Sequence, residues 1–313
     1  MELRLIEASS EIGAGLRGAS MGMAALRVAA WKLGSELFGH VEETVLRNEN
    51  DVLYEDDRSP NAHHIDGLIR FESDLAYEVY RYLRNGTFPI VVGGDHSIAI
   101  GSVSGAKMAA SKERLGVIWI DAHADLHTPL TTPSGNVHGM PLGLLMDLTG
   151  NEKGNEPLHY TMDVWDRLKK IGDDGPKFLP EDLVFIALRD YEAEERAIIE
   201  KHNIKVITVA ELRAQGAEKA VAETLEHLKG CQRLHVSFDV DSLDPSISRG
   251  TGTPVPDGLM ADEACDLLKG FCSDPRTVTL DVVEINPALD EGNAMAEATL
   301  NILEPLYNIL KSR

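Results

Sequence analysis

The chain has 313 residues, of which 43% are apolar and 26% charged, as expected for a globular protein with a large core. Its formal net charge of -21 argues against nonspecific binding to nucleic acid or to an anionic membrane; the charge serves solubility or attracts a cationic substrate. Three scattered cysteines without a CxxC pair predict neither a disulfide scaffold nor a zinc ribbon. We expect a cytoplasmic protein, because there is no signal-peptide core and no apolar run of transmembrane length.

Short apolar segments alternate with amphipathic segments along the chain. This alternation predicts an α/β fold, with a parallel sheet covered by helices on both faces, in one domain over residues 1–313. The expected strands are Leu3–Ala8, Ile90–Val92, Val117–Ile120, Leu183–Leu188, Lys205–Val209, Leu234–Phe238 and Val278–Val283. The expected helices are Ala24–Phe38, Leu68–Leu83, Ile98–Met108, Leu142–Leu148, Glu194–Lys201, Ala217–Leu228, Ala261–Gly270 and Ala294–Leu310.

Three features interrupt this pattern. The polar stretches Asn48–His64 and Thr149–Lys177 are expected to be surface excursions, and Pro305 should kink or restart the last helix. Gly13–Gly18 is formally GxGxxG, but Ser9–Ile12 separate it from the preceding strand, so we predict a flexible or substrate-bordering loop instead of a dinucleotide site.

Polar side chains follow three of the expected strands. The segments are Gly93-Gly94-Asp95-His96, Asp121-Ala122-His123-Ala124-Asp125 and Asp239-Val240-Asp241. Carboxyl ends of parallel strands meet at one sheet edge, where sites form, and alternate residues of an extended segment share a face. These residues would otherwise be turn and cap residues.

The candidate metal ligands are two imidazoles and four carboxylates: His96, Asp121, His123, Asp125, Asp239 and Asp241. One cation would rarely take six side chains and keep an open position. Two cations that share bridging carboxylates fit better, and an oxygen-rich set without a thiolate favours Mn²⁺ over Zn²⁺. Such a pair lowers the pKa of a bridging water.

Two further segments carry polar side chains suited to a substrate. Ser134 and Asn136 can hydrogen-bond a polar group, and His138 can move protons near neutral pH, unless the segment is only a capped turn. Glu284 ends an apolar strand, where a carboxylate either caps a turn or pairs with a guanidinium.

Together these motifs resemble the arginase (ureohydrolase) family. The matching segments, in the family's order, are GGDHS at 93–97, DAHAD at 121–125, SGNVHG at 134–139, SFDVDSLDP at 237–245, GTGTP at 250–254 and EINP at 284–287. The resemblance implies an arginase-like three-layer fold, with an eight-stranded parallel sheet flanked by helices, and two Mn²⁺ per chain. It also implies hydrolysis of L-arginine to ornithine and urea by a metal-bridging hydroxide, and a homo-oligomer (a trimer or hexamer).

The resemblance also implies a role for each candidate residue. One Mn²⁺ would be held by His96, Asp121, Asp125 and Asp239, and the other by Asp121, His123, Asp239 and Asp241. Asp125 would pass a proton to the leaving amine, His138 would relay protons to solvent, and Glu284 would anchor the guanidinium. Ser134 and Asn136 would bind the α-carboxylate, as in the arginase branch of the family, and Thr253 would line the site.

The chain departs from the family pattern at the amino-acid end of the substrate. His127 stands where asparagine is usual as a carboxylate ligand, and Asp190-Tyr191-Glu192 stands where Asp-x-Asp is usual for the α-amino group, with Glu195 following. Asp262 replaces an arginine often used in subunit contacts. The sequence therefore supports hydrolysis of a guanidine better than it supports arginine as the particular substrate.

Three alternatives remain open at this point. The same site would serve another guanidino acid, such as guanidinobutyrate, or agmatine. A deacetylase on a related fold would carry one zinc per chain. A noncatalytic metal-binding protein would release no urea from any guanidine.

Overall fold

The computed structural model describes residues 1–148 and 154–313. Within them, eight strands form one parallel sheet in the order β2-β1-β3-β8-β7-β4-β5-β6, which confirms the expected α/β class. The strands are β1 Glu2–Ala8, β2 Glu42–Val45, β3 Thr87–Gly93, β4 Leu115–Ile120, β5 Leu183–Ile186, β6 Lys205–Ile207, β7 Arg233–Asp239 and β8 Thr277–Val283.

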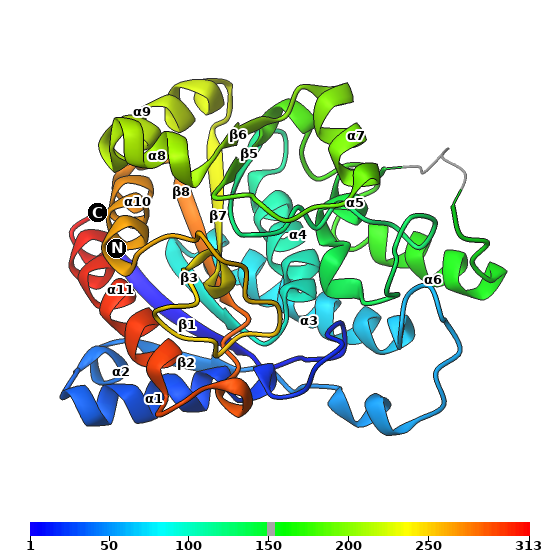
Figure 1. Cartoon of the computed structure of the whole chain (residues 1–313), viewed down its shortest axis with the longest axis horizontal. Coiled ribbons are helices and arrows are strands. Elements are labelled where there is room, and N and C mark those ends of the chain that lie inside the picture. The colour runs from blue at the N-terminus through cyan, green and yellow to red at the C-terminus, as the bar shows by residue number, and fades with distance from the viewer. Residues whose placement is uncertain (149–153) are drawn as a thin grey trace.

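Helices cover both faces of this sheet (Figure 1). One face is covered by α1 Gly22–Leu33, α2 Leu37–His40, α8 Val209–Gln215, α9 Ala217–His227, α10 Ala261–Ser273 and α11 Ala294–Lys311. The other is covered by α3 Ile65–Arg84, α4 Ala99–Ala110, α5 Pro141–Leu145, α6 His159–Lys169 and α7 Ala193–His202. The chain ends meet beside the first layer, where the Met1 amino group donates to the Lys311 carbonyl at 3.1 Å.

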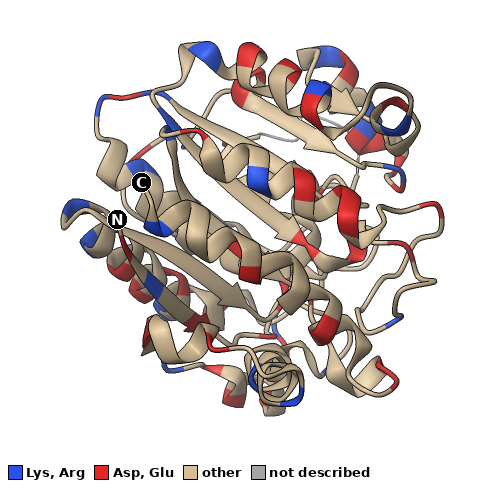
Figure 2. Cartoon of the chain, turned by 90° about the vertical axis from the view of Figure 1, so that its left-hand side faces the viewer, with Lys and Arg blue, Asp and Glu red and all other residues tan. Residues whose placement is uncertain are grey.

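The sheet is buried because apolar side chains cover its two faces. Every residue of β3, β4 and β8 is buried, as expected for parallel strands between helical layers. Figure 2 shows the charged residues spread over the helices and loops, with the strands behind them mostly uncharged. Among the described residues, no helix is long and apolar enough to cross a membrane.

Several element boundaries differ from the sequence-based expectation for local reasons. Gly34, with a left-handed φ of 70°, ends α1, so the expected helix Ala24–Phe38 is two helices. Ala187, with φ of 69°, ends β5 before the expected Leu188. The Thr208 hydroxyl accepts a hydrogen bond from the Glu211 N–H at 3.2 Å and starts α8 where a strand was expected to continue.

Two further expectations differ in part from the structure. The described part of the excursion 149–177 contains α6, whose Val164, Trp165 and Leu168 are buried; residues 149–153 lie outside the described residues. Helix α11 runs through Pro305 as one element and does not restart. Asn301, whose carbonyl loses its hydrogen-bond partner to Pro305, is an exposed residue, so water can replace the bond.

Candidate metal centre and substrate pocket

The strand order places the candidate ligands together. Strands β3, β8, β7 and β4 are neighbours in the sheet, and each ends in residues of the candidate site. His96 follows β3, Asp121 follows β4, Asp239 ends β7 and Glu284 follows β8. Four segments far apart in sequence therefore meet at one sheet edge.

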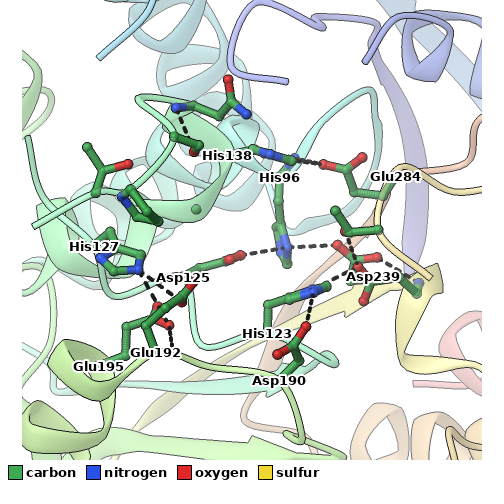
Figure 3. A pocket seen from close by; sticks show the side chains of 17 residues that line it. His96, His123, Asp125, His127, His138, Asp190, Glu192, Glu195, Asp239 and Glu284 are labelled. Carbon is green, nitrogen blue, oxygen red and sulfur yellow. Dashed lines mark hydrogen bonds and ion pairs between the residues drawn. The ribbon is translucent and has the colours of Figure 1, made fainter. Parts of the chain in front are cut away.

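His96 lies at the centre of one ligand group. Its Nδ1 atom lies 3.0 Å from Asp121 Oδ2 and 3.1 Å from Asp125 Oδ2 and from Asp239 Oδ2. Figure 3 shows the side chains of His96, Asp125 and Asp239 pointing toward one another. All four side chains are buried, so one imidazole nitrogen faces three carboxylate oxygens away from water.

His123 lies in a second group that shares Asp121 with the first. Its Nδ1 atom lies 3.0 Å from Asp241 Oδ2 and 3.5 Å from Asp121 Oδ1. The potential metal-binding atoms of His96, Asp121 and Asp239 lie within 4.8 Å of one another, and so do those of Asp121, His123 and Asp241. Asp121 is therefore the residue that the two groups share.

Backbone turns bring the candidate metal-binding side chains together. The sequence pattern instead predicts an extended segment with alternate residues on one face. Asp125 has a left-handed φ of 50°, so it does not continue the alternation of Asp121 and His123. In the turn Val240–Ser242, the Asp239 Oδ1 atom accepts the Asp241 N–H at 2.8 Å. A Cβ on Gly94 would lie 1.7 Å from the Ser10 carbonyl oxygen, so only glycine fits before Asp95 and His96.

The pKa values show that the carboxylates crowd one another. Burial, followed by the charges of Asp241 and Asp121, raises the pKa of Asp239 well above its usual range. Burial and Asp121 raise the pKa of Asp125 to about 6. Burial also acts to raise the pKa of Asp121, but the imidazoles of His123 and His96 beside this carboxylate outweigh burial and lower that pKa. Positive charge placed among these groups would relieve the repulsion.

The available donor atoms fit divalent cations. Within the described residues, His96 Nδ1 and Asp121 Oδ2 are buried and make no hydrogen bond, although they lie 3.0 Å apart. Unpaired buried polar atoms are costly unless something binds them. Hard carboxylate oxygens and imidazole nitrogens without a thiolate suit Mn²⁺.

A pocket opens above the metal-ligand cluster, and His138 and Glu284 form one side of it. His138 Nδ1 lies 2.9 Å from Glu284 Oε1, which also accepts the His96 N–H at 3.0 Å (Figure 3). Burial acts to lower the pKa of His138, but Glu284 outweighs it and raises the pKa to about 9. Burial acts to raise the pKa of Glu284, but its contact with His138 lowers it.

The predicted substrate contacts lie around the pocket. Its lining includes His127, Ser134, Asn136, Asp190, Glu192, Glu195 and Thr253. Asp190 is largely exposed, and its Oδ2 atom lies 3.8 Å from His123 Nε2. The Thr253 hydroxyl donates to Asp241 Oδ2 at 3.1 Å, so Thr253 contacts a candidate ligand as well as the pocket.

His127 has a different partner from the one expected. Its Nε2 atom lies 3.1 Å from Glu192 Oε2, a carboxylate of the protein itself. Glu195 Oε1 accepts the Leu126 N–H at 3.0 Å and its Oε2 accepts the Glu192 N–H at 3.0 Å. Burial and the neighbouring Glu192 raise the pKa of Glu195 to about 9. Glu192 is therefore the charged member of this carboxylate pair at neutral pH.

The sequence did not predict the residues that contact the candidate metal-binding side chains on the side away from the pocket. The His96 ring stacks on Trp119, with ring centroids 4.0 Å apart, and its Nε2 atom lies 2.8 Å from the Ser237 hydroxyl. Ser237 precedes Asp239 by two residues on β7, so strand alternation could have placed both on one face. The Arg189 guanidinium donates to the Asp241 carbonyl at 2.9 Å, a contact that no local pattern signals.

The glycine-rich loop lies beside the pocket and contacts its residue His138. The Gly13 N–H donates to Asp95 Oδ2 at 2.8 Å, and the Gly13 carbonyl accepts the His138 N–H at 3.1 Å. Ala14 and Gly15 line a small cavity together with His138. This cavity adjoins the candidate pocket, because Asn136, His138, Thr253 and Glu284 line both.

Comparison with known proteins gives matches over nearly the whole chain. The model of the arginase family matches residues 2–307. An arginase of Bacillus subtilis is 33% identical over 95% of this chain and 94% of its own length; an arginase of Staphylococcus aureus is 39% identical over 77% and 74%. The crystal structure of an arginase from Bacillus subtilis superposes with a TM-score of 0.81 at 31% identity, covering 98% of both chains.

Proposed function

Because the chain belongs to the arginase family and is thus a ureohydrolase, we propose that it hydrolyses L-arginine to L-ornithine and urea with two Mn²⁺ ions. The observation that carries this proposal is the contact of His96 Nδ1 with three carboxylate oxygens at 3.0–3.1 Å. Beside them, His123 approaches Asp121 and Asp241. A catalytic pair of cations needs this kind of clustered, oxygen-rich ligand set next to an open pocket.

In this proposal the six side chains divide into two overlapping ligand sets. His96 and Asp125 would hold one cation, His123 and Asp241 would hold the other, and Asp121 and Asp239 would belong to both sets. When bound, the cations supply a water molecule that is activated at neutral pH for attack on the guanidinium carbon.

The remaining residues of the pocket would handle the substrate and its protons. The Glu284 carboxylate accepts N–H groups of the planar guanidinium, and Asp125 passes a proton from the attacking water to the leaving amine. His138, already 2.9 Å from Glu284, exchanges protons with solvent. Ser134 and Asn136 donate hydrogen bonds to the α-carboxylate, while Asp190, Glu192 and Glu195 face the α-ammonium group.

We also propose one catalytic domain over residues 1–313 in a cytoplasmic homo-oligomer, a trimer or hexamer. One sheet that takes strands from residues 2–283 supports the single domain. The three cysteines, Cys231, Cys265 and Cys272, are buried free thiols, which suits a reducing compartment.

A urea-release assay after Mn²⁺ loading tests the function. We expect the highest kcat/KM for L-arginine among L-arginine, agmatine and 4-guanidinobutyrate. A higher kcat/KM for agmatine or 4-guanidinobutyrate would make that compound the assigned substrate. Release of no urea from any of the three compounds would overturn the proposal.

A further inference from the structure

The far end of a substrate would meet uncharged hydrogen-bond donors, such as Ser134 and Asn136, in this pocket. None of the residues that line it in the described part of the chain is Lys or Arg. The carboxyl groups of Glu192 and Glu195 lie beside His127, and that of Asp190 lies beside His123 (Figure 3). The hydrogen bonds of the His127 ring nitrogens therefore help to decide which group the substrate can carry at the end opposite its guanidinium.

The hydrogen-bond partners of His127 fix its tautomer. Glu192 Oε2 lies 3.1 Å from His127 Nε2, and a carboxylate only accepts, so Nε2 carries the hydrogen. Thr131 Oγ1 lies 3.1 Å from Nδ1 and accepts the Thr128 N–H at 3.0 Å, which leaves its own hydrogen free for Nδ1. Both ring nitrogens of His127 are thus engaged within the protein.

The His127 side chain is buried, whereas the Glu192 side chain is about half exposed. The imidazole is buried, and the His127 N–H donates to the Gly139 carbonyl at 3.1 Å. A Cβ on Gly143 would lie 2.2 Å from the His127 carbonyl oxygen, so α5 packs directly against this backbone. The Glu192 side chain is 53% exposed at the start of α7. The His127 donor and the neighbouring Glu195 carboxyl therefore together hold the exposed Glu192 carboxylate.

We propose that His127 is a positioning residue for ammonium recognition: it orients Glu192 toward the substrate's amino group and does not bind the substrate's carboxylate. This inference rests on the proposed function, because it needs a guanidine substrate bound with its amino-acid end at His127 and Glu192. Because the Glu192 carboxylate is already oriented, substrate binding loses less side-chain entropy. The pair then selects substrates with a cationic group at that end.

Two truncated forms of arginine separate the possible roles. Agmatine keeps the amino group and lacks the carboxylate, whereas 5-guanidinopentanoate keeps the carboxylate and lacks the amino group. We expect His127→Ala to raise KM about tenfold or more for L-arginine and agmatine, the scale of one charge-assisted hydrogen bond. It should change KM for 5-guanidinopentanoate less than twofold and leave kcat and bound Mn²⁺ unchanged.

Two further variants test the pathway through Glu192. His127→Gln keeps an N–H donor and should restore most of the lost affinity. Glu192→Gln should raise the same two KM values, and adding His127→Ala to it should have little further effect. Glu194→Gln, which removes the same charge from the same helical turn but does not line the pocket, is the matched control and should behave as the wild type.

Different results overturn different claims. Increased KM for L-arginine and 5-guanidinopentanoate, with agmatine spared, would make His127 a carboxylate ligand and refute the inference. Equal losses on all three substrates, or additive effects of the two substitutions, would also refute it. No urea from any substrate with the wild-type enzyme would instead refute the proposed function, and this inference with it.

Discussion

Two contacts behind the ligand cluster set the orientation of the His96 ring. Ser237 contacts Nε2 at 2.8 Å and Trp119 stacks on the ring, which leaves Nδ1 directed at the three carboxylates. Partners of this kind fix the tautomer and direction of a metal-binding histidine. Ser237 therefore acts on a bound ion through His96.

Replacement of Ser237 by alanine should weaken Mn²⁺ binding about 10- to 100-fold, since the ring loses its partner at Nε2. Calorimetric titration of the metal-free protein with Mn²⁺ measures this change. Ser73→Ala, on the exposed side of α3, is the control. An unchanged affinity in Ser237→Ala would show that stacking on Trp119 alone orients the ring.

The ion pair between His138 and Glu284 should make stability depend on pH. The pKa of His138 is raised from 6.5 to about 9, so its contribution is fully present below about pH 6.5 and is lost as the pH rises through 9. The pKa of Glu284 is lowered from 4.5, so its contribution is present above about pH 4.5 and is lost in more acidic solution. The pair stabilises most between about pH 4.5 and 6.5.

Urea unfolding of metal-free wild type and His138→Asn tests this dependence. The difference in unfolding free energy between them should be largest near pH 5.5 and small at pH 10. A difference that does not change with pH would mean that the pair contributes nothing through its charges.

Residue types and spacing predicted where the site residues lie. They predicted less well which side chains these residues contact. His96, Asp121 and Asp239 follow buried strands, and the order of the sheet brings them together. The partner of His127 could not be predicted, because Glu192 comes from another connection, 65 residues further along the chain. Only the fold places that carboxylate beside the imidazole.

Helix α4 begins directly after the His96 turn and packs closely on α3. A Cβ on Gly105 would lie 2.5 Å from the Ala76 carbonyl oxygen, and the buried Glu72 accepts the Gly101 N–H at 2.8 Å. Glycine thus allows the two backbones to approach, and Glu72 satisfies an N–H in the first turn of α4.

Gly105→Ala should lower the free energy of unfolding by about 1–3 kcal/mol, because the added methyl group forces α3 and α4 apart. Chemical denaturation gives this value. Gly39→Ala is the matched control in a helix: its Cβ would meet nothing within 4 Å, and it should be neutral or slightly stabilising. Equal stability of the Gly105 variant and the wild type would mean that the helix packing adjusts freely.

The elements that sequence reasoning missed are those with weak patterns. Strand β2, Glu42–Val45, is a short edge strand without a buried residue, so no apolar run marks it. Helix α6 lies in a segment whose glycine and charged residues suggested a loop. Its buried apolar residues, Val164, Trp165 and Leu168, gain partners only when α3 and α5 pack beside it.

At the scale of the whole molecule, negative charge is concentrated where cations are needed. The chain carries 51 acidic and 30 basic residues, and four buried aspartates converge at the end of the sheet. Their mutual repulsion destabilises the metal-free fold, and cations that bind only the folded state stabilise it by mass action.

Chelation of bound metal should therefore lower the melting temperature, and Mn²⁺ should restore it. At a free concentration 100 times Kd, one cation stabilises the fold by about 2.7 kcal/mol, which corresponds to several degrees. Scanning calorimetry with and without a chelator measures the shift. Asp121→Ala should lose most of the response to Mn²⁺; a full response in this variant would place the bound metal elsewhere.

The family and the parallel sheet could be predicted from the motifs, but the strand order could not. Alternating β and α segments fit several doubly wound orders, and local patterns do not distinguish among them. In the observed order, β8 lies between β3 and β7, which places Glu284 between the segments that carry His96 and Asp239.

Anomalous X-ray diffraction from crystals soaked in Mn²⁺ tests the central claim most directly. We expect two manganese peaks per chain, one beside His96 and one beside His123, with Asp121 contacting both. A single peak, or peaks away from these side chains, would contradict the proposed pair of cations.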